Sequence, residues 1–439
     1  MINLFDNYNQ RSWDLHYSLI SSGYNNPTIS LEDDGFLPED VTSPYQFYTN
    51  QVSGHKKPLY YNQVHLPKYW EIVGNNNFAE IIDMGKKRGH IHFVEPTQER
   101  NVKEVDWLDE NGIVQLKDHY NKFGHLFAQT FFHENIGPVQ KIYYNSNGFE
   151  VISENYVTGD IVLTTKEKLK IFHSKVDFVT QYLKDAKFEL DRIFFNSLST
   201  PMLVAYYLNE VGNDVLFWDE EIQEDVPGNL LALLNGSRRP TSVMVQNKKS
   251  YEKLLTLLDQ NQKEKIKFLG YQYPFVRPNL NQKNALILTN SDQILNCEDL
   301  VKKIPTLTFH IGALTEMSPK LMELQKYENV RLYPNISSHH ISQLKNICDY
   351  YFDINQYEEI LGASRMAFEH NMLILAFAST CHQKNYVSMD HIFNDDELDQ
   401  FILMVEKCLN ELSYLTQQVD GQREAANLET KENYKKFIK

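Results

Sequence analysis

Residues 340–379, HISQLKNICDYYFDINQYEEILGASRMAFEHNMLILAFAS, predict two buried strands joined by a helix. Asp349–Asp353 and Met372–Phe377 are short apolar runs of the length that buried strands have. The residues between them place apolar and small side chains at helical spacing: Ile360, Leu361, Ser364, Ala367 and Phe368. A strand, a helix and a second strand form a βαβ unit, so this stretch predicts a parallel sheet.

The segment that follows the first of these strands, Ile354–Leu361, is the predicted ligand-binding position. In open α/β sheets, ligands bind where strands end and the next helices begin. Asn355, Glu358 and Glu359 lie in this segment, and their amide and carboxylate groups can hydrogen-bond to hydroxyl groups. We therefore treat these three residues as candidate binding residues.

The composition limits the classes of protein to which the chain can belong. Its 439 residues exceed what one core usually organises, so we expect two or three domains. Lys and Arg number 43 against 58 Asp and Glu, a net charge of −15, which argues against a nucleic-acid partner. The four cysteines match no metal-ligand spacing, and we expect them to be reduced. With no signal peptide and no run of apolar residues long enough to span a bilayer, we expect a cytoplasmic protein.

Along the chain, α/β patterns at both ends flank a segment of a different character. Residues 45–173 alternate strand-length runs with turn signals such as Asn111-Gly112 and Asn147-Gly148, which is typical of an antiparallel meander. The edges and aromatic side chains of such a sheet favour pairing with another chain. The candidate partner-binding residues are Trp107, Phe131, Phe132, Tyr143 and Tyr144.

The segment after the first strand resembles that of nucleotide-sugar glycosyltransferases with two Rossmann-like domains, but it lacks their donor-binding residues. Those enzymes carry two glutamates separated by seven residues; Glu358 fits the first position, and Met366 stands at the second. They also place an Arg and then a Lys against the donor diphosphate, where this sequence has Asp292 and Cys297. A diphosphate leaving group needs such positive charge. The glycine-rich loop of the active enzymes is absent as well.

Over its whole length the chain resembles the stabilising, non-catalytic B subunits of the bacterial glycosyltransferase pair that modifies serine-rich repeat adhesins. The resemblance lies in SWDLHYSLISSGYNNPTISLEDDGFLPEDVTSPY (12–45), KPLYYNQVHLPKYWEI (57–72), VDWLDENGIVQLKDHYN (105–121) and FFNSLSTP (194–201). It implies an α/β fold with two Rossmann-like domains in a GT-B-like arrangement and an inserted antiparallel extended β-sheet domain. The expected domains are 1–44 with 174–274, the sheet at 45–173, a second Rossmann-like domain at 285–420 and a charged helix at 421–439.

The resemblance also implies a function. Such a subunit stabilises a catalytic A subunit, which transfers N-acetylglucosamine from its UDP donor to Ser and Thr, and it helps to recognise the adhesin before export by the accessory Sec system. We expect a heterotetramer of two A and two B subunits, with possible peripheral association at the cytoplasmic face of the membrane. Asn355, Glu358 and Glu359 would then contact the acceptor.

Two alternatives differ from this reading. An active glycosyltransferase with a divergent donor site would need a basic group from elsewhere in the fold, such as Arg277 or Arg331. A free-standing lectin or peptide-binding module would fit the meander but would leave both α/β parts without a role. The sequence itself nominates no catalytic, cofactor-binding or metal-binding residue.

Overall fold

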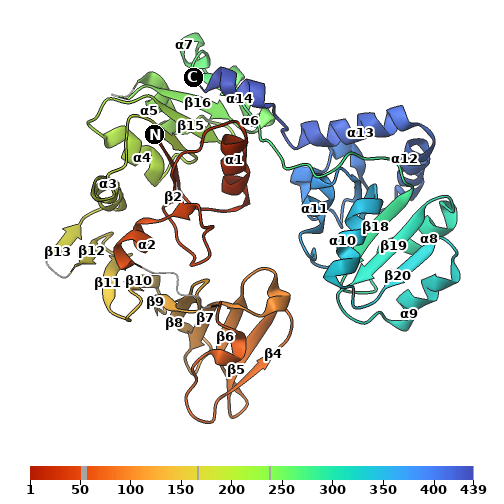
Figure 1. Ribbon diagram of the computed structural model, residues 1–439, viewed down its shortest axis with the longest axis horizontal. Coiled ribbons are helices and arrows are strands. Elements are labelled where there is room, and N and C mark those ends of the chain that lie inside the picture. Colours follow the sequence, from red (N-terminus) through yellow and green to blue (C-terminus); the bar gives the residue numbers. More distant parts are fainter. Residues whose placement is uncertain (51–56, 166–167, 237–238, 439) are drawn as a thin grey trace. The chain divides into compact units, whose positions relative to one another are not determined.

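The structure is a computed structural model that describes residues 1–50, 57–165, 168–236 and 239–438. The chain divides into two compact units (Figure 1). The first comprises Met1–Leu269 together with Glu432–Lys439, and the second comprises Gly270–Lys431. The first unit contains a seven-stranded parallel sheet and a ten-stranded antiparallel sheet, and the second contains a six-stranded parallel sheet. The protein is therefore a mixed α/β protein with two parallel sheets and one antiparallel sheet.

The parallel sheet of the first unit gathers strands from both ends of that unit's sequence. From edge to edge its strands are β17 (Ile266–Phe268), β16 (Thr241–Val245), β15 (Asp214–Trp218), β14 (Ile193–Phe195), β1 (Ile2–Phe5), β2 (Thr28–Ser30) and β3 (Val41–Thr42). The helices are α1 (Gln10–Ser21), α2 (Pro44–Thr49), α3 (Lys175–Asp185), α4 (Thr200–Tyr207), α5 (Gly228–Asn235), α6 (Lys248–Leu257), α7 (Gln260–Lys263) and α14 (Lys431–Phe437). Side-chain caps begin several of them: Asn9 accepts a hydrogen bond from Ser12 N, and Ser174 accepts one from Asp177 N.

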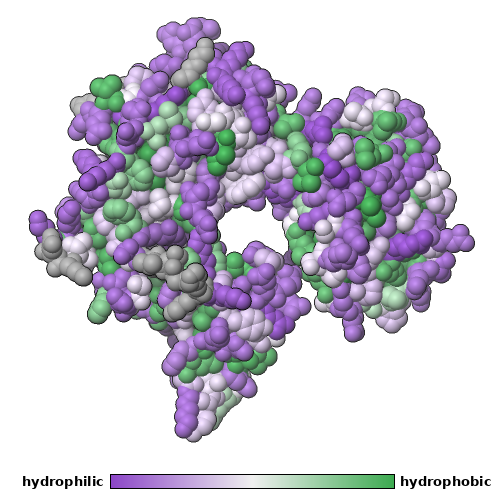
Figure 2. All heavy atoms as spheres, in the orientation of Figure 1, coloured by the Kyte–Doolittle hydropathy of each residue, from purple (hydrophilic) through white to green (hydrophobic). Residues whose placement is uncertain are grey.

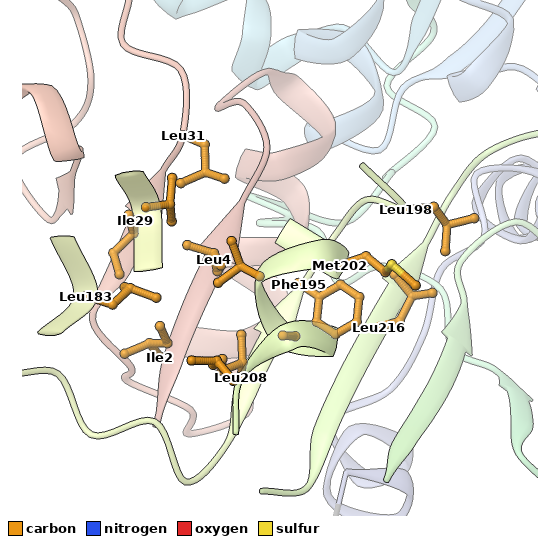
Figure 3. Close-up of a cluster of buried hydrophobic side chains, with 14 of the residues drawn as sticks. Ile2, Leu4, Ile29, Leu31, Leu183, Phe195, Leu198, Met202, Leu208 and Leu216 are labelled. Atoms are coloured by element: carbon orange, nitrogen blue, oxygen red, sulfur yellow. The ribbon is translucent and has the colours of Figure 1, made fainter. Parts of the chain in front are cut away.

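One face of this sheet packs against helices to form the main core of the unit (Figure 3). Leu4, Phe195 and Leu216 come from neighbouring strands, and Leu183 and Met202 come from α3 and α4. Each of these side chains is almost fully buried. The apolar strand runs of the sequence therefore form a buried parallel sheet, as their pattern predicts.

The antiparallel sheet is a meander in which each strand pairs with its neighbours in sequence. Its strands are β4 (Glu71–Gly74), β5 (Phe78–Asp83), β6 (Lys86–Phe93), β7 (Val102–Leu108), β8 (Val114–Tyr120), β9 (Leu126–His133), β10 (Gly137–Tyr144), β11 (Glu150–Asn155), β12 (Ile161–Thr164) and β13 (Leu169–Phe172). The predicted meander is confirmed, but it begins later than residue 45. Residues 44–49 form α2 instead, because Ser43 caps a helix that starts with Pro44.

The two ends of the antiparallel sheet have different surroundings. Near β10 and β11 the sheet packs against α2, where the Tyr45 and Tyr143 rings stack with centroids 4.1 Å apart, so this end shares the core of the parallel sheet. Near β4–β7 a smaller core includes Val64, Ile81 and Val105. Hydrophobic side chains are visible at this second end (Figure 2), where Val73 and Phe78 are among the exposed apolar residues.

In the second unit, the strands from edge to edge are β20 (Val330–Tyr333), β19 (Thr308–Ala313), β18 (Asn284–Thr289), β21 (Tyr350–Asp353), β22 (Leu373–Phe377) and β23 (Ile392–Phe393). The helices are α8 (Cys297–Lys303), α9 (Pro319–Met322), α10 (Ser338–Ile347), α11 (Ala363–Glu369), α12 (Leu398–Asn410) and α13 (Leu412–Ala425). All pairs are parallel, so the carboxyl ends of the six strands lie at one edge of the sheet. The βαβ unit predicted from residues 340–379 is confirmed as β21–α11–β22.

The expectation of one charged helix over 421–439 is wrong, because α13 ends at Ala425 and α14 begins at Lys431. A second break lies at Glu411, whose extended backbone (φ −123°, ψ 98°) separates α12 from α13. The helix α14 belongs to the first unit, where Tyr24 Oη donates a hydrogen bond to Ile438 O over 2.6 Å.

Candidate functional site

The candidate binding segment lies at the carboxyl edge of the second unit's sheet, directly after β21. Asn355 is buried there, and its side chain holds the loop together. Thr289 Oγ1 donates to Asn355 Oδ1 over 3.0 Å, and Asn355 Nδ2 donates to the carbonyls of Tyr357 and Glu358 over 3.1 and 3.0 Å. Asn355 therefore shapes this segment and presents little of its amide to a ligand.

The two candidate glutamates have different environments. The Glu359 carboxylate is half-buried, and its Oε1 accepts a hydrogen bond from Ser364 N over 2.7 Å near the start of α11. Its Oε2 accepts a longer bond, 3.2 Å, from Gln383 Nε2. Glu358 is exposed. Of the three predicted residues, Glu358 is thus the one whose carboxylate faces solvent at this edge.

A histidine that the sequence reasoning missed organises the same loop. His382 follows β22 and bridges two parts of the edge: its Nδ1 lies 2.6 Å from Asp353 Oδ1, and its Nε2 lies 2.5 Å from Tyr357 O. The hydrogen bond with the buried Asp353 carboxylate raises the pKa of His382 to about 9, so the imidazole is charged at neutral pH. Because His382 follows the second strand of the predicted βαβ unit, its position in the sequence could have identified it as a candidate site residue.

The two positions at which the resemblance predicts the absence of diphosphate-binding basic residues carry an acidic and a buried thiol side chain in the structure. Asp292 follows β18, and its Oδ2 accepts a hydrogen bond from Ser318 Oγ over 3.2 Å. Cys297 is buried, and burial raises the pKa of its thiol to about 12, so the thiol is neutral. Met366, at the position of the second glutamate of active enzymes, is buried in α11. A thioether cannot serve as the hydrogen-bonding partner that a ribose diol requires.

The two arginines that could have replaced these groups lie at the opposite edge of the sheet. Arg277 Nη1 is 2.6 Å from Oδ1 of Asp349, the residue that precedes β21. Arg331 Nη1 donates to the carbonyls of Glu328 and Val330, at the start of β20. Because amino and carboxyl ends of parallel strands lie at opposite edges, neither guanidinium is at the candidate binding position. The divergent-donor-site alternative therefore cannot use Arg277 or Arg331 as its basic groups.

The register of the antiparallel sheet divides the five candidate partner-binding residues between its two faces. Trp107 pairs with Leu116, and Leu116 pairs with Phe131, so these side chains share one face. Tyr144 joins them, because its Oη donates to Oε1 of Gln129 over 2.7 Å and Gln129 alternates in phase with Phe131. We call Trp107, Leu116, Phe131, Ile142 and Tyr144 the aromatic face; all five are half-buried.

A chain of hydrogen bonds fixes the Trp107 and Tyr144 rings on this face. Trp107 Nε1 donates to Asp118 Oδ2 over 2.8 Å, and Gln129 Nε2 donates to Asp118 Oδ1 over 2.7 Å. Through Gln129 the chain continues to Tyr144. The face thus presents aromatic surface in a fixed arrangement across β7 to β10, as an interface requires.

Tyr143 and Phe132 lie on the other face. Tyr143 is 1% exposed and stacks on Tyr45, so it belongs to the core of this chain and has no surface left for a partner. This corrects its assignment as a contact residue; strand alternation predicts the face on which a side chain lies but not what covers that face. Phe132 is half-buried beside the β9–β10 turn.

Comparison with protein-family profiles gives four matches along the chain. They are the GtfB N-terminal domain (residues 2–48), the GtfB middle domain (70–173), the GtfB third domain (175–257) and the GftB/GlyA-F C-terminal domain (285–422). The UDP-N-acetylglucosamine–peptide N-acetylglucosaminyltransferase stabilizing protein GtfB of Streptococcus agalactiae is 44% identical over 100% of this chain and 99% of its own length. The chain belongs to the GtfB family.

Two solved structures have folds similar to that of this chain. A chain in the crystal structure of a GtfA/B complex bound to UDP and GlcNAc is 42% identical, with a TM-score of 0.93 over 99% of this chain and 98% of that one. The pneumococcal O-GlcNAc transferase GtfA, solved with UDP and GlcNAc, is 15% identical with a TM-score of 0.52, covering 100% of this chain and 98% of that chain. At that identity the likeness concerns the fold alone.

None of the helices among the described residues combines the length and the apolar character that crossing a bilayer requires. Within the same residues, no group of three or more His, Cys, Asp and Glu side chains is arranged to hold a metal ion.

Proposed function

We propose that the protein is the non-catalytic stabilising and acceptor-recognition subunit of a UDP-GlcNAc:protein O-GlcNAc transferase complex. The observation that carries this is the carboxyl edge of the second unit's sheet, which has Asp292, Cys297 and Met366 where an active enzyme needs basic groups and a glutamate. The name of the Streptococcus agalactiae relative, a stabilizing protein of such a transferase, supports the same assignment.

In this proposal the partner is a catalytic A subunit of the GtfA kind, in a complex of two A and two B subunits. The acceptor is a serine-rich repeat adhesin that receives its first sugar before export, with peripheral membrane or accessory Sec association at the cytoplasmic face. The aromatic face supports a partner contact, because its rings are half-buried within this chain and held by hydrogen bonds.

We also propose that the two parallel sheets belong to Rossmann-like domains in a GT-B-like arrangement. The domains would be 1–44 with 174–274, the extended sheet at 45–173, the second Rossmann-like domain at 285–420 and the terminal segment 421–439. The whole-chain likeness to the GtfA/B complex structure supports this. Glu358 would contact acceptor hydroxyls, while Asn355, Glu359 and His382 would hold the loop that presents it.

Co-expression with the catalytic subunit tests the proposed function. The catalytic subunit should be recovered in soluble form at several-fold higher yield with this chain than without it, should co-purify with it, and should transfer sugar to a serine-rich acceptor peptide. This chain alone should transfer none. Transfer by the isolated chain, or equal recovery of the catalytic subunit in its absence, would overturn the proposal.

A further inference from the structure

A pocket in the first unit has no role in the proposed function. It lies between the loop that follows β2 and the tip of the β8–β9 hairpin, and its volume is about 410 Å³. Its lining includes Asp33, Glu39, Lys122, Phe123 and Phe127. The volume is within the range of small-ligand pockets, about 300–1,000 Å³.

The two walls of this pocket are locked together. Lys122 N donates to Gly35 O over 2.9 Å, and Lys122 Nζ donates to Leu37 O over 2.6 Å. Gly35 has a φ of +83°, and a Cβ atom there would lie 2.7 Å from Tyr120 O, so only glycine allows this approach. Asn121 Oδ1 fixes the hairpin tip by accepting hydrogen bonds from Phe123 N and His125 N. The pocket is therefore preformed.

The polar groups of the pocket carry excess negative charge. The Asp33 carboxylate is 4% exposed, and it accepts hydrogen bonds from Gly35 N and Ser43 Oγ, one on each oxygen. Since a carboxylate oxygen can accept two bonds, one acceptor position remains on each. Glu39 adds a second, exposed carboxylate.

The nearby cations do not balance these carboxylates. The Lys122 ammonium offsets only one of the two carboxylates, and it donates a hydrogen bond to the Leu37 carbonyl. The half-buried Lys141 interacts electrostatically with Asp33, but it also interacts with Glu154, Glu32 and Glu104. Burial raises the pKa of Asp33, so its carboxylate would gain from a cation. A phosphate-bearing ligand would meet like charge here.

We propose that this pocket binds the side chain of a lysine or arginine residue carried by a polypeptide. Pro38, Val41, Phe123 and Phe127 provide apolar surface for the methylene stem. The ammonium or guanidinium group would then meet Asp33 and Glu39 in charge-assisted hydrogen bonds. The assignment does not depend on the proposed function, because it follows from the pocket alone.

The test uses the full chain and four probes observed by ligand-detected NMR titration at low ionic strength. The probes are Nα-acetyl-lysine N-methylamide, the matching arginine and norleucine compounds, and N-acetylglucosamine. The two cationic probes should bind about tenfold more tightly than the norleucine probe, the ratio expected from one charge-assisted hydrogen bond. Equal binding of norleucine, or preferential binding of N-acetylglucosamine, would overturn the assignment.

Matched variants locate the binding. Glu39→Gln and Phe123→Ala should each weaken binding of the cationic probes several-fold, whereas Asp40→Asn, the same charge change at a neighbouring residue outside the pocket, should leave it within twofold. Glu39 and Asp40 are both exposed, so neither change should affect folding, and thermal unfolding checks this. Equal weakening by Glu39→Gln and Asp40→Asn would show a diffuse charge effect and contradict the site.

Discussion

Asp214 and Arg239 form a fully buried ion pair in the first unit, and we expect this pair to stabilise the folded unit. Arg239 Nε and Nη2 lie 2.7 and 2.6 Å from the two Asp214 oxygens, and Ile193 N also donates to Asp214. Asp214→Asn should destabilise the unit by about 3–5 kcal/mol, because it leaves a buried guanidinium without its counter-charge. Thermal unfolding should show a clear fall in Tm. Asp34→Asn, which breaks an exposed pair with Lys103, should change Tm little; equal effects would contradict this account.

His382 sets a prediction for pH dependence in the second unit. Its pKa of about 9 lies above the ordinary value of about 6.5 because Asp353 stabilises the charged ring. The stability that this pair contributes is therefore fully present below about pH 6.5 and is lost as pH rises through about 9. An NMR titration should place the His382 midpoint near pH 9, and Asp353→Asn should return it toward 6.5. A wild-type midpoint near 6.5 would refute the pairing.

At the scale of elements, the antiparallel sheet places the adjacent residues Phe131 and Phe132 on opposite faces, although both are candidate partner-binding residues in the sequence. Phe131 lies on the aromatic face, whereas Phe132 lies on the opposite one. Phe131→Glu should reduce co-purification with the catalytic subunit several-fold, because it puts a charge among the half-buried rings. Phe132→Glu is the matched control and should retain the partner, with Tm reported for both. Loss of the partner with Phe132→Glu alone would place the contact on the other face.

The elements also show which features the sequence could predict. The β21–α11–β22 unit was predictable, because its strands are apolar runs and Ser364, Ala367 and Phe368 are buried in its helix. Ile360 and Leu361, which were also predicted at helical spacing, precede α11. The break at Glu411 was not predictable, since amphipathic residues continue on both sides of it. The role of Asn355 also needed the structure, because its partner Thr289 is 66 residues away in the chain.

At the scale of the whole molecule, the sequence already shows that basic residues are missing after the first strand of the second unit's sheet. It does not show whether basic residues from elsewhere in the fold could replace them. The lack of Lys and Arg between Thr289 and Glu298 can be seen directly. Only the parallel register shows that Arg277 and Arg331 lie at the other edge and cannot compensate. The pocket beside Asp33 could not be predicted from the sequence, because its walls come from segments that are distant in the chain.

Calorimetric titration of the isolated protein with UDP-N-acetylglucosamine tests the central claim most directly. Without cationic partners for the diphosphate, the dissociation constant should be weaker than about 1 mM, which corresponds to a binding free energy of about −4 kcal/mol. The catalytic subunit, titrated under the same conditions, provides the positive control. A micromolar dissociation constant for the isolated protein, about −8 kcal/mol, would show a working donor site and contradict the account.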